Sequence, residues 1–159
     1  MPRNSITALV TLSIVLVSAG VAAAVTADAP SRYYGGVPAA LDDPTIVAIF
    51  DAANTADIET GALAARRGAS PEVREFGAML VRDHEHVRKL GRDLAKKLNV
   101  TPTPPKDDQG ARDHAAAMAR LSSLEGPAFD RVFLQHEVAF HKSVIDAVQT
   151  TLLPAIRNE

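Results

Sequence analysis

The chain has 159 residues, a formal net charge of −2 and 47% hydrophobic residues, the composition of a globular protein with one ordinary domain. The near-neutral charge argues against nucleic acid as the main partner, because phosphate binding needs a concentrated basic face. The chain has no cysteine, which excludes disulfides, thiolate zinc sites, iron–sulfur clusters and thiol catalysis.

The first 27 residues have the pattern of an export signal. A positive charge at Arg3 precedes an uncharged run over residues 5–27, in which an apolar centre gives way to small residues. This order predicts a secretory signal peptide over residues 1–27. The alternative is an uncleaved N-terminal membrane anchor, because the run is close to the roughly 20 residues that span a bilayer. Either interpretation places the domain outside the cytoplasm, in the periplasm or otherwise exported.

Prolines and glycines divide the rest of the chain. Residues 28–41 contain two prolines and a Gly-Gly pair, which predicts an irregular leader. Residues 42–159 are predicted to form one helical domain, in which prolines stand at the edges of periodic segments. Pro44 follows Asp43 and Pro71 follows Ser70, and both pairs are typical of an N-cap and the first helical position.

Four intervals carry apolar residues at helical spacing, namely residues 44–67, 71–98, 108–124 and 127–152. No strand-like alternation competes with this pattern. Gly68 and Asn99 follow the first two intervals and are expected to end them in the left-handed conformation. Short connections favour antiparallel neighbours, so the predicted fold class is all-α, a ferritin-like up-down four-helix bundle.

Polar residues interrupt the apolar faces of three of these helices. At about 100° per residue, Asp57 lies near the centre of the first apolar stripe. On the second helix, Asp83 lies among apolar residues and His84 lies at the margin. On the fourth helix, Glu137 and His141 share one face at spacing i, i+4. Unpaired carboxylates in a core are costly, so they need protonation, strong hydrogen bonds or a cation.

These five residues are the candidate metal ligands. Carboxylate and imidazole groups suit iron, manganese or zinc, and helical bundles hold metals between facing side chains. The alternatives are a hydrogen-bonded network of Asp57, Asp83 and His84 that fixes packing, and an ordinary surface pair of Glu137 with His141. The chain contains no phosphate-binding loop, serine nucleophile elbow or His-Glu-x-x-His helix, so the sequence names no catalytic or cofactor-binding residue.

Three segments resemble a bacterial ferritin-like family of unknown function, domain family 4142, described as predicted outer-membrane or exported proteins. They are residues 53–64, residues 71–77 running into Val81-Arg-Asp-His84, and residues 121–130, followed by His141 and Leu152-Leu-Pro154. The resemblance implies an exported bundle, with envelope association and no established activity. The family's acidic position falls on Asp57, its Asp-His pair on Asp83 and His84, and its fourth-helix histidine on His141. It also implies a further helix after Pro154, whereas this chain ends at Glu159.

The ligand pattern departs from a ferritin-type di-iron centre, which needs a Glu on two helices and Glu-x-x-His on the other two. Here Asp83 with His86 is the nearest equivalent, Glu137 precedes His141 by four residues, and the third helix has no inward acid. A di-iron oxidase or ferroxidase is therefore the least favoured function. We expect a non-catalytic metal-binding or envelope stress-related module. The alternative is a structural or interaction module without metal, acting as a homo-oligomer or with a protein partner.

Overall fold

The computed structural model describes residues 41–157, and within them the chain is all-α, with no strand. Four long helices form the bundle: α2 (Asp43–Arg67), α3 (Pro71–Lys97), α4 (Gln109–Ser122) and α5 (Gly126–Ala147). A π-helical turn, η1 (Val148–Leu152), and the short α6 (Leu153–Ala155) continue α5. The predicted all-α four-helix bundle is confirmed. The predicted signal peptide, and the predicted leader up to residue 40, lie outside the described residues.

Each of the first three helices begins at a side chain that caps it. The carboxylates of Asp42 and Asp108 and the hydroxyl of Ser70 accept hydrogen bonds from backbone amides in the first turns of α2, α4 and α3. The expected cap of the first helix is wrong by one residue, because Asp42 rather than Asp43 accepts from the Thr45 amide, at 3.0 Å.

The two residues expected to be left-handed after α2 and α3 differ. Asn99 has φ 55° and confirms the expectation. Gly68 has φ −53°, so the expectation for this residue is wrong. A Cβ on Gly68 would lie 2.8 Å from the Ala64 carbonyl oxygen and from Val73 Cγ1. Glycine is therefore needed here for close packing of the α2–α3 turn, and not for its φ angle.

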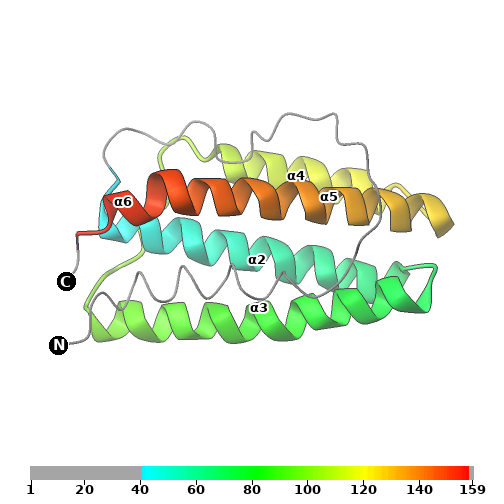
Figure 1. The fold of residues 1–159 in the computed structure, drawn as a ribbon, viewed down its shortest axis with the longest axis horizontal. Helices are drawn as coiled ribbons and strands as arrows, with labels where there is room; N and C mark the ends of the chain where they lie inside the picture. The colour runs from blue at the N-terminus through cyan, green and yellow to red at the C-terminus, as the bar shows by residue number, and fades with distance from the viewer. Residues whose placement is uncertain (1–40, 158–159) are drawn as a thin grey trace.

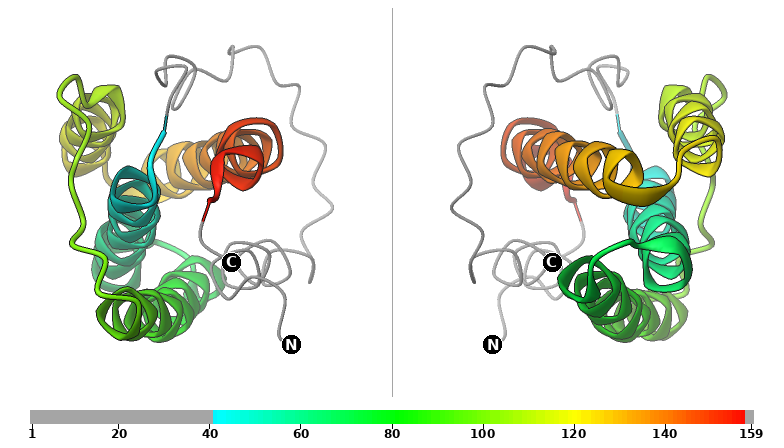
Figure 2. Two further views of the ribbon diagram at one scale, coloured as in Figure 1. Left: turned by 90° about the vertical axis from the view of Figure 1, so that its left-hand side faces the viewer. Right: turned by 90° about the vertical axis from the view of Figure 1, so that its right-hand side faces the viewer.

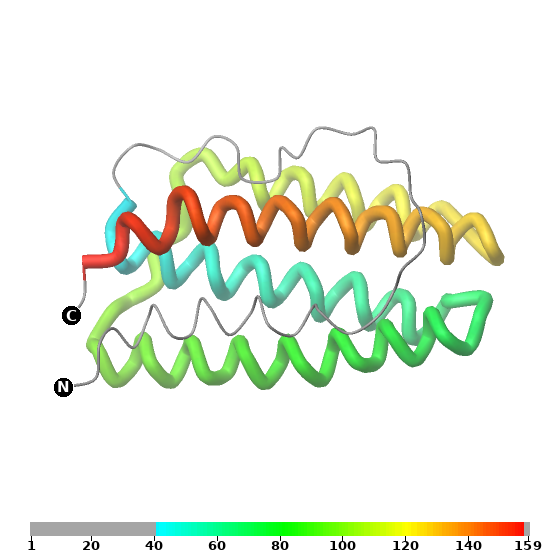
Figure 3. Tube along the Cα trace, viewed as in Figure 1, coloured from blue at the N-terminus to red at the C-terminus, as the bar shows by residue number. Residues whose placement is uncertain are grey.

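The chain runs up and down through the four helices in order (Figures 1 and 3). Viewed from its ends, the bundle has α2 in the middle, with α3 on one side and α4 and α5 on the other (Figure 2). The contact between α2 and α3 is by far the most extensive, and α2 also packs against α4 and α5. None of the described helices is long and apolar enough to span a membrane.

Two glycines bring the backbones of α2 and α3 into contact. A Cβ on Gly61 would lie 2.8 Å from the Gly77 carbonyl oxygen, and a Cβ on Gly77 would lie 2.5 Å from the Gly61 carbonyl oxygen. Because the helices are antiparallel, this contact sets the register between them. The register places Asn54 level with His84, and Asp57 within one turn of that level.

The core has apolar clusters at its two ends and a polar stretch between them. One end buries Leu41, Ile46, Ile49, Val148 and Leu152. The other end buries Leu63, Ala64, Val73, Leu80, Leu121, Phe129 and Phe133. Midway along the helices lie the small cluster of Ala53, Ala56 and Phe140 and six of the seven buried polar residues of the described chain, namely Asn54, Asp57, Thr60, His84, Glu137 and His141. We call these six residues the polar band, and the two apolar ends shield it from solvent along the bundle axis.

Candidate functional site

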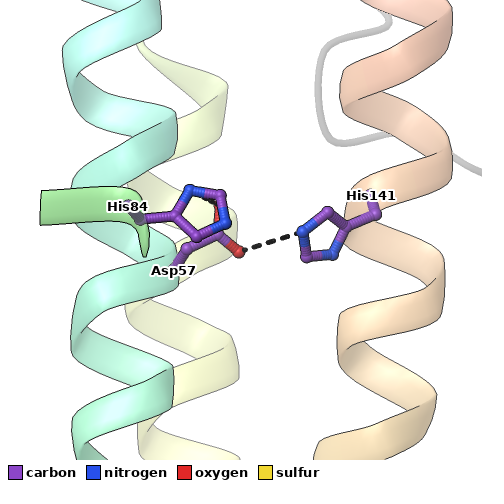
Figure 4. A group of neighbouring side chains, drawn as sticks. All are labelled: Asp57, His84 and His141. Carbon is purple, nitrogen blue, oxygen red and sulfur yellow. Dashed lines mark ion pairs between the residues drawn. The ribbon is translucent and has the colours of Figure 1, made fainter. Parts of the chain in front are cut away.

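Three helices bring Asp57, His84 and His141 together in the polar band. Asp57 comes from α2, His84 from α3 and His141 from α5, and all three residues are buried. One potential ligand atom of each lies within 4.8 Å of the others. Figure 4 shows Asp57 and His84 next to each other, with His141 facing them from the opposite helix. The residues are 27 and 57 positions apart in the chain, so only the folded bundle forms this group.

The Asp57 carboxylate approaches both histidines. Its Oδ2 atom lies 3.3 Å from His84 Nδ1, and its Oδ1 atom lies 3.6 Å from His141 Nε2 (dashed in Figure 4). The contact between Asp57 Oδ1 and His141 Nε2 is too long for a hydrogen bond. Both atoms are buried, and neither has a hydrogen-bond partner among the described residues.

The hydrogen bonds of His141 determine which of its nitrogens is free. Its Nδ1 atom lies 2.8 Å from the Glu137 carbonyl oxygen. A carbonyl oxygen only accepts, so Nδ1 carries the hydrogen and Nε2 keeps its lone pair. The lone pair of Nε2 therefore lies close to the lone pairs of Asp57 Oδ1. Two acceptors at this separation need a proton or a cation between them.

Glu137 adds a second buried carboxylate to the group. Its Oε2 atom lies 3.7 Å from His141 Nδ1. Both carboxylate oxygens are buried without a hydrogen-bond partner among the described residues. The sequence prediction of an inward face shared by Glu137 and His141 is therefore confirmed, and the alternative of an ordinary surface pair is wrong.

Burial shifts the pKa values of the two acids and the two histidines in the direction that favours the neutral form of each group. It raises the pKa of Asp57 well above its ordinary value, with a further rise from the nearby Glu137 charge. It raises the pKa of Glu137 to about 8. Burial, reinforced by His141, lowers the pKa of His84 to about 4, and burial also lowers the pKa of His141. At neutral pH the two imidazoles are therefore neutral and Glu137 largely keeps its proton.

Asp83 does not join this group. It pairs with its neighbour Arg82 at 2.8 Å, and its side chain is 24% exposed. The buried face of α3 runs through Gly77, Leu80 and His84, so the expectation that Asp83 marks the centre of the stripe and His84 its margin is reversed. The physical reason is the contact of Gly77 with α2. Because Gly77 has no side chain, α3 is oriented with the face that contains Gly77 against α2.

Two further features of the site escape the sequence reasoning. Asn54 is buried and its Oδ1 atom lies 3.1 Å from His84 Nδ1. Its position one turn before Asp57, on the apolar face of α2, is the signal that identifies it. The second feature is a pair beside the site, in which His114 Nε2 lies 2.7 Å from Glu59 Oε2 and links α4 to α2.

His136 lies near the same side of the bundle and stacks on Phe140, with ring centroids 5.8 Å apart. Burial, together with the nearby charges of His114, His141 and Arg120, lowers the pKa of His136 to about 4. This imidazole is therefore neutral at neutral pH, like those of His84 and His141.

Comparison with protein families finds a match over residues 34–159 to the family described as "Domain of unknown function (DUF4142)". Comparison with curated proteins and with solved structures finds no match. The matched range contains every residue of the polar band.

Proposed function

The chain belongs to the DUF4142 family of domains of unknown function, and we propose that it binds one divalent transition-metal ion between Asp57, His84 and His141. The observation that carries the proposal is the pair of buried acceptors, Asp57 Oδ1 and His141 Nε2, which lie 3.6 Å apart and have no hydrogen-bond partner among residues 41–157. An ion between them would satisfy both atoms.

The separations of the donor atoms fit one ion. Metal–ligand bonds of roughly 2.0–2.2 Å in a tetrahedral site place neighbouring donor atoms about 3.3–3.6 Å apart. Asp57 Oδ1 and His141 Nε2 lie 3.6 Å apart, and one potential ligand atom of each of the three residues lies within 4.8 Å of the others. The first pair therefore already has the spacing of two ligands of one ion, with His84 close enough to supply the third. Two imidazoles and a carboxylate are ligands that iron, manganese and zinc accept.

The charges of the buried group favour a single ion. Asp57 and Glu137, when ionised, contribute two negative charges, and neutral imidazoles contribute none. One divalent ion makes the group neutral, whereas two ions would leave an uncompensated positive charge in the core. Leu121 is the one buried residue of α4, so this helix offers no inward acid to a second ion. These features argue against a di-iron oxidase.

The second candidate is a metal-free polar network that fixes the packing of the helices. It is favoured by the raised pKa of Asp57, because a protonated Asp57 can donate to His141 Nε2. The two candidates differ in one respect, since only the first predicts an affinity for metal.

Metal titration of the full chain, after treatment with a chelator, tests the proposal. We expect one zinc, manganese or iron(II) ion per chain, and a loss of affinity of roughly 100-fold or more in Asp57→Asn and His141→Gln. Asp83→Asn and His86→Ala are matched controls, because Asp83 pairs with Arg82 and His86 is exposed. Wild-type protein that binds none of the three metals, or equal losses in the controls, would contradict the proposal.

We also propose that the domain works outside the cytoplasm, on the basis of the sequence pattern of residues 1–27. Fractionation of cells that express the full chain, with sequencing of the mature N-terminus, tests this location. A mature protein that begins at Met1 in the cytoplasmic fraction would contradict it.

A further inference from the structure

Asn54 is the buried amide of the polar band and lies level with His84 across the α2–α3 contact. Only 3% of the surface of Asn54 is exposed to solvent. A buried amide must satisfy both its nitrogen and its oxygen, so its hydrogen bonds fix its orientation.

The side-chain nitrogen of Asn54 already makes a hydrogen bond within α2. Nδ2 donates to the carbonyl oxygen of Phe50, one turn earlier in α2, at 2.8 Å. This bond turns Oδ1 toward His84, whose Nδ1 atom lies 3.1 Å away. An amide oxygen only accepts, so His84 Nδ1 donates and therefore carries the ring hydrogen.

The consequence is that His84 keeps its lone pair on Nε2. His141 has the same tautomer for a different reason, because its Nδ1 donates to the Glu137 carbonyl oxygen. A histidine that binds a metal through one ring nitrogen usually donates the hydrogen on its other ring nitrogen to such an acceptor. This hydrogen bond fixes both the tautomer and the orientation of the ring. Asp57 Oδ2 is also near His84 Nδ1, at 3.3 Å, but Asp57 is itself a proposed ligand.

We propose that Asn54 is a positioning residue, which holds His84 with its hydrogen on Nδ1 and so presents Nε2 to the metal ion. This inference rests on the proposed function and adds to it the ligand atom of His84. Asn54 remains available as an acceptor when the carboxylate of Asp57 is bound to the ion.

Two variants separate the acceptor from the shape of the side chain. Asn54→Leu has a similar size and no acceptor, and Asn54→Asp keeps an oxygen toward His84. Loss of an acceptor of this kind typically lowers metal affinity about 10- to 100-fold. We expect that loss of zinc affinity in Asn54→Leu and its recovery in Asn54→Asp.

Thr55→Val is the matched control on the next residue of the same helix. It removes a hydroxyl that donates to the Asp51 carbonyl oxygen and accepts from Arg88 Nη1. It should therefore lower the melting temperature without changing zinc affinity. An equal loss of affinity in Thr55→Val would assign a merely structural role to Asn54 and overturn the inference.

The tautomer is measured directly by ¹⁵N NMR of the histidine rings in the metal-free full chain. We expect a protonated Nδ1 on His84 in the wild type and in Asn54→Asp. A wild-type His84 protonated on Nε2 would overturn the inference, even if zinc binds. The expected tautomer in a wild-type protein that binds no zinc would instead contradict the proposed function, while still supporting the role of Asn54.

Discussion

At the scale of single residues, the polar band contains acids and bases whose pKa values have moved in opposite directions. The carboxyl groups of Asp57 and Glu137 hold their protons to higher pH than usual. The imidazoles of His84 and His141 release theirs at lower pH than usual. Both shifts have the same cause, which is the cost of an uncompensated charge in a closed interior.

The metal-free protein should lose stability as the pH rises from about 6.5 to about 8. In this range the native state keeps a proton on Glu137, whose pKa is about 8, and the unfolded chain has already released it. The free energy of unfolding then falls by up to about 1.4 kcal/mol per pH unit for each retained proton. Below about pH 6.5 the histidines oppose this dependence of stability on pH. There the unfolded chain binds protons on His84 and His141, whereas these residues stay neutral in the native state. Urea unfolding at a series of pH values measures this profile.

Glu137→Gln should flatten the fall of stability above pH 6.5, because it removes the carboxyl group that titrates there. Glu125→Gln is the control, since the side chain of Glu125 is 89% exposed. The explanation fails if Glu137→Gln keeps the wild-type slope.

Sequence periodicity predicted the inward positions of Asp57, Glu137 and His141, because an acid or a histidine in an apolar stripe is easily recognised. It placed Asp83 and His84 in the wrong order. Adjacent residues differ by only about 100° around a helix, so the assignment depends on how the helix is rotated. That rotation is set by Gly77, which adds nothing to an apolar stripe, and it appears only when α2 is packed against α3.

At the scale of helices, the contact of Gly61 with Gly77 determines the register of α2 and α3. Asn54 and Asp57 belong to α2, and His84 belongs to α3. A change in the separation of the two helices therefore moves the ligands of the proposed site relative to one another.

Gly77→Ala should destabilise the protein by about 1–3 kcal/mol, because overpacking displaces two backbones. The new Cβ would lie 2.5 Å from the Gly61 carbonyl oxygen and 2.6 Å from the Ala65 amide nitrogen. Helix propensity alone would change stability in the opposite direction, by up to about 1 kcal/mol. Thermal unfolding measures the sign, and zinc titration should show a parallel loss of affinity.

Gly91→Ala is the comparison for this prediction. Its Cβ would meet the ring of Phe50 at 2.6 Å, and a side chain can move aside more easily than a backbone. The loss of stability should therefore be smaller than in Gly77→Ala. If Gly77→Ala were more stable than the wild type, the backbone contact would not limit the packing.

The positions of the helices could be predicted from the sequence because prolines and capping residues mark their beginnings. Ser70 with Pro71 identified the start of α3 correctly. The end of α2 was harder, since Gly68 suits both a left-handed cap and a tight contact. Its neighbours Val73 and Arg74 come from the next helix, so the choice depends on tertiary packing.

At the scale of the whole molecule, two apolar clusters enclose a polar band that spans three helices. An ion bound in this band would interact with the native state and not with the unfolded chain, because the three proposed ligands are far apart in sequence. Binding energy is then added to the stability of the fold.

Zinc at about 100 times its Kd should raise the stability of the protein by about 2.7 kcal/mol. For a domain of this size, that corresponds to an increase in Tm of roughly 10 °C. Calorimetry with and without zinc measures the shift, and Asp57→Asn should abolish it. A similar increase in Asp57→Asn would show that zinc stabilises the protein at another place.

The arrangement of the helices gives the polar band a further role in cooperativity. The long helices of the described part of the chain form two hairpins, α2–α3 and α4–α5, and the first has the more extensive contact. His84 belongs to one hairpin and His141 to the other, with ring centroids 5.9 Å apart. With an ion between them the hairpins would open as one unit, whereas without it α4–α5 could detach while α2–α3 stays folded. The occupancy of a small buried group would thus decide whether the domain has one unfolding transition or two.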